Sequence, residues 1–119
     1  MKVAVTAQGN TQQSPVDPRF GRARFLVIVD SETGASWAVD NQPNLDAVQG
    51  AGVQAARKIV ELGVSALITG HVGPKAFSAL QAGGVTVYTD AQGSVAEAIQ
   101  QFQQGRLAKA SAPDVEGHW

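Results

Sequence analysis

The sequence predicts an α/β fold in which a five-stranded mixed sheet is covered by helices, with the element order β-β-β-α-β-α-β-α. Two observations support this prediction. The first 40 residues hold three β-type runs with no helix between them, whereas the rest of the chain alternates β-type runs with segments of helical apolar spacing. The chain has 119 residues, of which 44% are hydrophobic, and this supplies the core of one domain.

Three predicted strands open the chain. Residues 2–7 (KVAVTA) form a short β-type run, and residues 25–30 (FLVIVD) form a continuous apolar run typical of a strand buried on both faces. Residues 35–40 (ASWAVD) alternate like a half-buried partner strand, and the SETG turn before them predicts a hairpin. Because the hairpin strands are antiparallel, Asp30 and Asp40 at their ends should lie at opposite sheet edges.

Two β-α-β crossovers follow the hairpin. The expected elements are a helix over 48–62 closed by Gly63, a strand over 64–69, a helix over 74–82 begun by Pro74, a strand over 85–89, and a helix opened by the S-x-x-E box of Ser94 and Glu97 and ended by Gly105. Right-handed crossovers would make the last two strands parallel to the first. We therefore expect one domain over residues 1–107, followed by a mobile tail over 108–119 that lacks periodicity.

This topology places several loops at one edge of the sheet. The loop over 8–24, the loop over 41–47, the GHVG turn over 70–73 and the turn after residue 89 should all emerge at the carboxyl edge. Open α/β sheets bind ligands at that edge. We therefore look there for the functional residues.

Composition excludes several classes of site. The chain has no cysteine, so it can form no disulfide, thiolate zinc site, CxxC redox centre or cysteine-ligated iron-sulfur cluster. The formal charge of -1 gives no global field that would attract nucleic acid or an anionic membrane. No run approaches the roughly 20 apolar residues of a transmembrane helix, and we expect no signal peptide because MKVAVTAQGN turns polar after a few residues. We expect a cytoplasmic protein with neither nucleic-acid nor membrane partners.

The loop over 8–24 carries the first candidate site. Basic and aromatic side chains gather in DPRFGRARF, namely Arg19, Phe20, Arg22, Arg24 and Phe25. Guanidinium groups are weakly hydrated and suit large, diffuse anions, so this composition favours a bulky anionic ligand. The alternative is that one arginine pairs with Asp17, the others are solvated and both phenylalanines belong to the core.

The second candidate site is the strand-to-helix turn formed by Thr69, Gly70, His71, Val72, Gly73, Pro74 and Lys75. Glycines permit close backbone approach, and the helix that begins at Pro74 offers unsatisfied N–H groups to an anion. The alternative is a tight turn that needs glycine for its geometry. His71 is a candidate metal ligand, but a second ligand such as His118 would come from the tail. A metal at His71 should therefore arrive with ligands of its own.

Catalysis is not expected. A metal-dependent nuclease would need clustered carboxylates beginning on the first strand, and KVAVTA has none. There is no GxSxG elbow and no cysteine nucleophile. A hydrolase is accordingly the least favoured function.

Four blocks of the chain resemble one known family. KVAVTAQG, DPRFGRARFLVIVD, the loop and helix over 41–63, and ALITGHVGPKAFSALQAGGVTVY are similar to the dinitrogenase iron-molybdenum cofactor biosynthesis family, over about Lys2 to Leu107. The start KVAVTAQGN and the lack of cysteine resemble its orange-protein subgroup. The resemblance implies a three-layer α/β/α fold with a ribonuclease-H-like motif.

The resemblance also implies a function. Such a protein would be a non-enzymatic carrier of a preassembled metal-sulfide cluster, either molybdenum-copper-sulfur or similar to the iron-molybdenum cofactor, held non-covalently. Its partners would be the cluster and a cluster-assembly or ATPase protein. The implied cluster-binding residues are Phe20, Arg22, Arg24, Gly70, His71, Gly73 and Lys75. The alternative function is a regulatory module that binds a nucleotide or phosphate at GHVGPK and contacts a partner protein.

Overall fold

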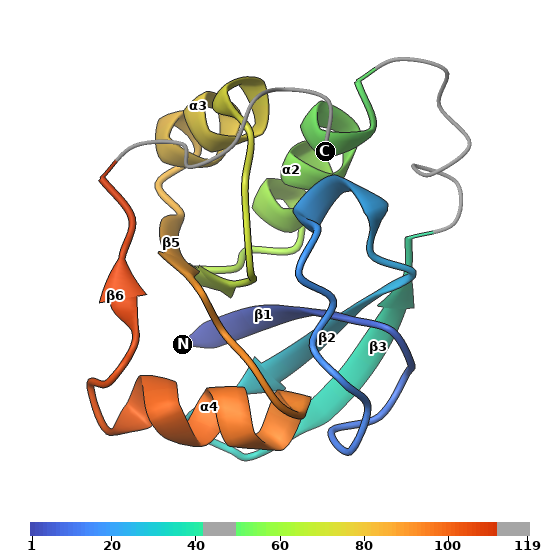
Figure 1. The fold of residues 1–119 in the computed structure, drawn as a ribbon, viewed down its shortest axis with the longest axis vertical. Helices are drawn as coiled ribbons and strands as arrows, with labels where there is room; N and C mark the ends of the chain where they lie inside the picture. Colours follow the sequence, from blue (N-terminus) through green and yellow to red (C-terminus); the bar gives the residue numbers. More distant parts are fainter. Residues whose placement is uncertain (42–49, 112–119) are drawn as a thin grey trace.

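A computed structural model of the protein describes residues 1–41 and 50–111, which fold around one mixed β-sheet (Figure 1). The strands are β1 (Lys2–Ala7), β2 (Phe25–Asp30), β3 (Ser36–Asp40), β4 (Ala66–Ile68), β5 (Thr86–Thr89) and β6 (Ala108–Lys109). The helices are η1 (Phe20–Arg22, a 3-10 turn), α2 (Ala51–Glu61), α3 (Pro74–Ala82) and α4 (Val95–Gln103). The predicted order of strands and α-helices is confirmed up to α4.

The strand directions agree with the predicted topology. The sheet order is β3-β2-β1-β4-β5-β6. β1 pairs antiparallel with β2 and parallel with β4, β2 pairs antiparallel with β3, and β4 pairs parallel with β5. The carboxyl ends of β1, β3, β4 and β5 therefore share one edge of the sheet. Asp30 and Asp40 lie at opposite edges, because Asp30 pairs with Lys2 and Asp40 with Phe25.

The predicted count of five strands is wrong, because the described residues form six. Ala108 and Lys109 pair antiparallel with Thr89 and Tyr88, and the N–H of Ala110 donates to the carbonyl oxygen of Val87 at 2.8 Å. A two-residue strand is too short to show alternation, so the sequence pattern did not reveal it. Residues 112–119, including His118, lie outside the described residues, and both the domain boundary and the mobile tail stay predictions.

Helices cover both faces of the sheet, which confirms the three-layer α/β/α architecture (Figure 1). α2 and α3 pack over one face through a core that includes Leu26, Ile28, Ile59, Leu67, Phe77 and Leu80. α4 packs over the other face through a core that includes Val3, Val5, Val27, Ile68 and Ile99. Neighbouring residues of β1 and β2 alternate between these two cores, so both strands are buried on both faces, as expected for β2.

The helix boundaries follow the expected capping residues. The Ser94 hydroxyl accepts from the Glu97 N–H, and the Glu97 carboxylate accepts from the Ser94 N–H, each at 3.1 Å. Pro74 is the first residue of α3. Gly63 and Gly105 follow α2 and α4 with φ of 73° and 71°, the left-handed conformation that glycine adopts without strain.

α2 begins at Ala51, and Gly50 precedes it in the left-handed conformation with φ of 76°, so Gly50 is outside the helix that was predicted to include it. Residues 48–49 of the predicted helix lie outside the described residues. The same holds for residues 42–47 of the predicted second loop. None of the helices in the described residues is long and apolar enough to cross a membrane.

Candidate functional site

The first half of the long loop over residues 8–24 is tied to the sheet and to α4. The N–H of Gln8 donates to the Pro15 carbonyl at 3.0 Å, and the N–H of Val16 donates to the Gly93 carbonyl at 2.9 Å. The N–H of Val95, at the start of α4, donates to the Ser14 carbonyl at 2.9 Å. The loop is therefore ordered by backbone hydrogen bonds, and it leads residues 17–24 onto the carboxyl edge.

The second half of the loop packs directly against the turn over 70–73. The N–H of His71 donates to the Pro18 carbonyl at 2.7 Å, and the N–H of Phe20 donates to the His71 carbonyl at 3.3 Å. Gly70 permits this approach, because a Cβ atom built on it would lie 2.6 Å from the Pro18 carbonyl oxygen. The two candidate sites predicted from the sequence are therefore one connected structure.

Two buried threonine hydroxyl groups lie between this junction and the sheet. The Thr6 hydroxyl donates to the Asp17 carbonyl at 2.7 Å and lies 2.8 Å from the Thr69 hydroxyl, within hydrogen-bond distance. The N–H of Asp17 donates to the Thr6 carbonyl at 2.8 Å. Both threonine side chains are buried. Thr6 thus holds the loop on the sheet, and Thr69 contacts the Thr6 hydroxyl and presents no hydroxyl of its own to solvent.

Phe20 and Val72 anchor the junction in the core. Each residue is 1% exposed, and both belong to the core under α2 and α3. For Phe20 the structure supports the alternative that its ring belongs to the core. Phe20, Thr69, Gly70 and Val72 therefore shape the edge from inside, and the outer surface of the site is left to the charged residues and to His71 and Gly73.

Two of the three arginines are held by carboxylates. Asp17, which is 5% exposed, accepts from the Arg19 N–H at 3.0 Å and lies 3.8 Å from Arg19 Nε. Arg24 donates to both oxygens of Asp40 at 3.3 and 3.4 Å, and its guanidinium lies 5.1 Å from the Phe25 ring centroid. The alternative in which one arginine pairs with Asp17 is confirmed for Arg19, but Arg24 is also paired, with Asp40.

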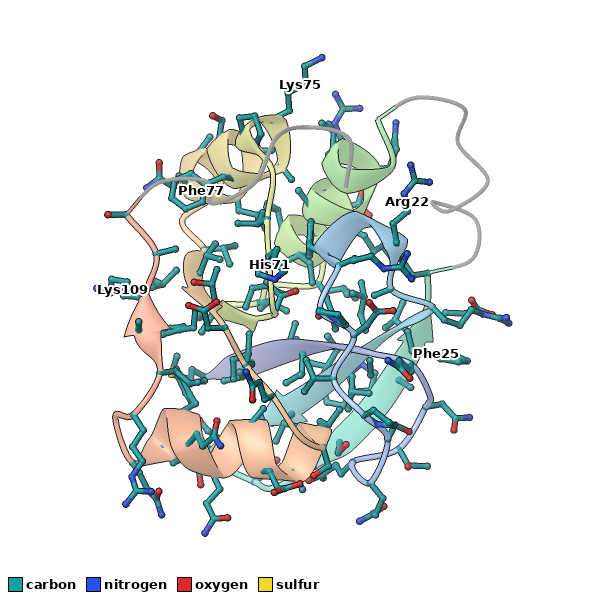
Figure 2. All side chains as sticks on the ribbon, in the orientation of Figure 1. Arg22, Phe25, His71, Lys75, Phe77 and Lys109 are labelled. Carbon is teal, nitrogen blue, oxygen red and sulfur yellow. The ribbon has the colours of Figure 1, made fainter. Side chains whose placement is uncertain are left out.

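Arg22 differs from the other two arginines. It is the last residue of η1, its side chain is exposed, and it makes no ion pair with any residue in 1–41 or 50–111. In Figure 2 the Arg22 side chain points outward from η1. Arg22 is therefore a cation at the carboxyl edge whose charge no described carboxylate balances.

The structure does not gather every predicted residue at one point. Arg19 and His71 are bridged through their backbones, and His71 is partly exposed. Lys75 lies in the first turn of α3, and Figure 2 shows its side chain directed away from His71. Within the described residues, no three histidine, aspartate or glutamate side chains form a group able to hold a metal ion.

Two acidic residues at this edge, Asp40 and Asp90, form hydrogen bonds with candidate site residues that were not predicted. Asp40 binds Arg24, and the strand register that places Asp40 opposite Phe25 explains their contact. Asp90 is exposed after β5, has a φ of 64°, and donates its N–H to the Gly70 carbonyl at 2.9 Å. The hairpin register was the signal that could have revealed the Asp40 contact. The expected turn after residue 89 placed Asp90 at this edge, but no sequence signal indicated its hydrogen bond to Gly70.

One aspartate at the opposite edge of the sheet, Asp30, has a lowered pKa. The N–H of Glu32 donates to Asp30 Oδ1 at 2.9 Å, and this hydrogen bond lowers the pKa of Asp30 below its ordinary value. Asp30 thereby caps the turn of the β2–β3 hairpin. This group is distant from the candidate site in the sheet, because it pairs with Lys2 at the start of β1.

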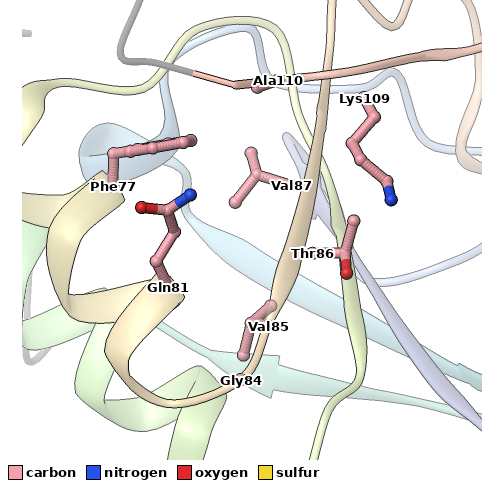
Figure 3. A pocket seen from close by; sticks show the side chains of 8 residues that line it. All are labelled: Phe77, Gln81, Gly84, Val85, Thr86, Val87, Lys109 and Ala110. Carbon is pink, nitrogen blue, oxygen red and sulfur yellow. The ribbon is translucent and has the colours of Figure 1, made fainter.

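A cavity of about 390 Å³ lies between α3, β5 and β6, and not at the junction. It is lined by Phe77, Gln81, Gly84, Val85, Thr86, Val87, Lys109 and Ala110. In Figure 3 Phe77 and Gln81 lie on one side of β5, while Lys109 lies on the other. The cavity therefore extends to both sides of β5, and the polar side chains that line it do not point toward one common ligand position.

The family model described as dinitrogenase iron-molybdenum cofactor matches residues 1–105. The chain belongs to this family. The resemblance noted in the sequence blocks is thereby confirmed, and the family connects the chain with proteins named for a metal cofactor.

Solved structures share both sequence and fold with this chain, and one further protein is similar in sequence. The apo form of the orange protein from Desulfovibrio gigas is 43% identical, with a TM-score of 0.94 and coverage of 96% of each chain. A putative NifB protein from Thermotoga is 37% identical, with a TM-score of 0.84 and coverage of 98% of each chain. An uncharacterized protein from Methanocaldococcus jannaschii is 32% identical over 112 residues, which cover 92% of this chain and 91% of that protein.

Proposed function

We propose that the protein is a non-enzymatic carrier for a preassembled, anionic metal-sulfide cluster, held non-covalently at the carboxyl edge of the sheet. One observation carries this proposal. The arginine-rich segment is fixed against the 70–71 turn by the Pro18 and His71 hydrogen bonds, in a chain that has no cysteine. The site therefore offers cations on a rigid frame and no thiolate, which suits a cargo that brings its own sulfur.

The proposed contacts follow from exposure. Arg19, Arg22 and Arg24 are exposed, and His71 and Gly73 are partly exposed, so these five residues would face the cargo. The Lys75 side chain is directed away from His71, so Lys75 would contribute only its charge near the first turn of α3. Guanidinium groups donate in a planar fork to large anions at little desolvation cost, which suits a thiometallate surface. His71 is the candidate direct metal contact. Gly73 and the first turn of α3 would add backbone N–H groups and the positive end of the helix dipole.

The composition of the cargo is proposed by analogy with the relatives. The family name refers to an iron-molybdenum cofactor, and the orange protein is a structural relative at 43% identity. We propose a molybdenum-copper sulfide cluster or a related molybdenum or iron-sulfur cluster as the cargo. We further propose a cytoplasmic location and delivery to or from a cluster-assembly or ATPase protein.

Reconstitution tests the function directly. Apo-protein would be mixed with tetrathiomolybdate and Cu(I) without oxygen, and then separated from free metal by gel filtration. The proposal predicts visible charge-transfer absorption, molybdenum and copper in the protein fraction. A protein fraction without colour or metal, under conditions where the protein stays folded, contradicts the proposal.

Arginine variants locate the site. Arg22→Ala should lose cluster retention, while Arg106→Ala serves as the matched control because Arg106 is also exposed and lies between α4 and β6, outside the two segments that form the site. Circular dichroism would confirm that both variants are folded. Equal retention by the two variants would place the cargo elsewhere on the protein.

A further inference from the structure

A buried alanine separates the last two arginines of the long loop. Ala23 is 0% exposed, whereas Arg22 and Arg24 on either side of it are exposed. The backbone at Ala23 is extended, with φ of -67° and ψ of 136°. Successive side chains of an extended backbone point to opposite sides, so the inward position of Ala23 leaves both arginine side chains on the outer side.

Asn41 binds this segment through both its backbone and its side chain. Its N–H donates to the Arg24 carbonyl at 2.8 Å, and its side-chain Nδ2 donates to the Ala23 carbonyl at 2.8 Å. The regular pairing of β2 with β3 ends at Phe25 and Asp40. Asn41 therefore binds two consecutive carbonyl groups just beyond the last strand pair, where the arginine segment enters β2.

The buried surroundings of Asn41 explain why an amide is needed at this position. Asn41 is 0% exposed, so its side chain cannot contact a cargo itself. Ala23 has no exposed surface either, so its carbonyl oxygen must find a hydrogen-bond donor inside the protein. The Nδ2 group of Asn41 is such a donor, and an apolar side chain at position 41 would leave that carbonyl without this partner.

The arginine segment is thus held at both ends by buried polar side chains. At its start, the Asp17 carboxylate accepts from the Arg19 N–H at 3.0 Å. At its end, Asn41 holds Ala23. Arg22 lies between these two points and makes no ion pair with any carboxylate among the described residues, so its place depends on the backbone that Asn41 holds.

We propose that Asn41 is a positioning residue of the cargo site, whose side-chain amide keeps Ala23 inside the protein and thereby presents Arg22 and Arg24 together at the carboxyl edge. This inference rests on the proposed carrier function. Loss of the amide should weaken the retention of an anionic cluster, although the substituted side chain touches no part of it.

The rate of cluster release from Asn41→Ala tests the proposal. Protein reconstituted with tetrathiomolybdate and Cu(I) would be transferred into buffer without free metal, and the decay of its visible absorption would give the rate. We expect release about tenfold faster than from the parent protein, which is the scale of one net hydrogen bond. Ile99→Val, in the core under α4, is the matched control for a general loss of stability and should release the cluster at the parent rate.

Hydrogen exchange of the apo-protein tests the same contact without cargo. In Asn41→Ala, the N–H groups of Ala23 and of position 41 should exchange at least about tenfold faster than in the parent, while that of Val5 in the central strand should change little. Asn41→Ser keeps a shorter donor, so it should lie between the parent and Asn41→Ala in both measurements.

The outcomes separate this inference from the proposed function. A parent protein that takes up no cluster contradicts the proposed function, and this inference with it. If the parent retains the cluster, release from both Asn41 variants at the rate of Ile99→Val overturns this inference alone. Unchanged exchange at Ala23 in Asn41→Ala also overturns it, because the side chain would then not hold the segment.

Discussion

The N–H of His71 donates a 2.7 Å hydrogen bond to the carbonyl oxygen of Pro18, and this contact joins the two candidate segments into one edge. It fixes the backbone beside Arg19, while the Arg22 side chain stays exposed in solvent. The rigidity of this junction favours non-covalent binding, because a site that is already ordered loses less conformational entropy when the ligand binds.

Gly70 should be intolerant of a side chain. In Gly70→Ala the new Cβ would meet Pro18, at 2.5 Å from its Cα and 2.6 Å from its oxygen, so the two segments must separate. We expect a loss of about 1 to 3 kcal/mol in the free energy of unfolding, measured by urea denaturation, and weaker cluster retention. Ser78→Ala on the exposed face of α3 is the control. Unchanged stability in Gly70→Ala would show that the loops adapt freely.

Asp40 should compete with the cargo for Arg24. In Asp40→Asn the guanidinium loses its anionic partner, so we expect tighter retention of an anionic cluster in the reconstitution assay. Stability should change by less than about 1 kcal/mol, because the Arg24 and Asp40 side chains are 50% and 52% exposed. Weaker retention in Asp40→Asn would mean that the ion pair positions Arg24 for binding and does not compete.

The buried hydroxyl of Thr6 should contribute to stability. Thr6→Val removes the donor to the Asp17 carbonyl and the partner of the Thr69 hydroxyl, and it leaves buried polar atoms without a hydrogen bond. We expect a loss of about 1 to 3 kcal/mol in urea denaturation. Thr33→Val, at an exposed turn position, should cost less. If the two variants lose the same free energy of unfolding, the hydroxyl network does not hold the loop.

Asp30 should make stability depend on pH. Its pKa is lowered in the folded chain, chiefly by the hydrogen bond from the Glu32 N–H, so the ionised carboxylate stabilises the hairpin above the ordinary pKa of an aspartate. That contribution is lost as the pH falls through the folded-state pKa. Asp30→Ala should thus be less stable than the parent protein at pH 7, and the difference should shrink in acid. A difference that is constant with pH would contradict this assignment.

Much of the fold could be predicted because local signals agreed with the final packing. The apolar run of β2, the Ser94 capping box and Pro74 each specify an element within a few residues, and the right-handed crossover rule then sets the parallel strands. β6 escaped prediction because two residues carry no period. Its position depends on pairing with Tyr88 and Thr89, which is a tertiary effect.

The candidate site could be predicted in outline but not in its internal contacts. The sequence indicated which residues reach the carboxyl edge, since topology alone places them there. It could not show that Thr69 is tied to Thr6, or that Arg24 is bound by Asp40, because these contacts depend on the register between strands distant in sequence. The direction of Lys75 away from His71 likewise depends on where α3 lies over the sheet.

Elemental analysis of the protein, purified from its native host without oxygen, tests the central claim most directly. If the protein carries a metal-sulfide cluster without thiolate ligands, the purified chain should contain a metal such as molybdenum together with acid-labile sulfide, and both should be lost from Arg22→Ala but not from Arg106→Ala. A folded protein that contains neither metal nor sulfide, and takes up neither on reconstitution, would contradict the account.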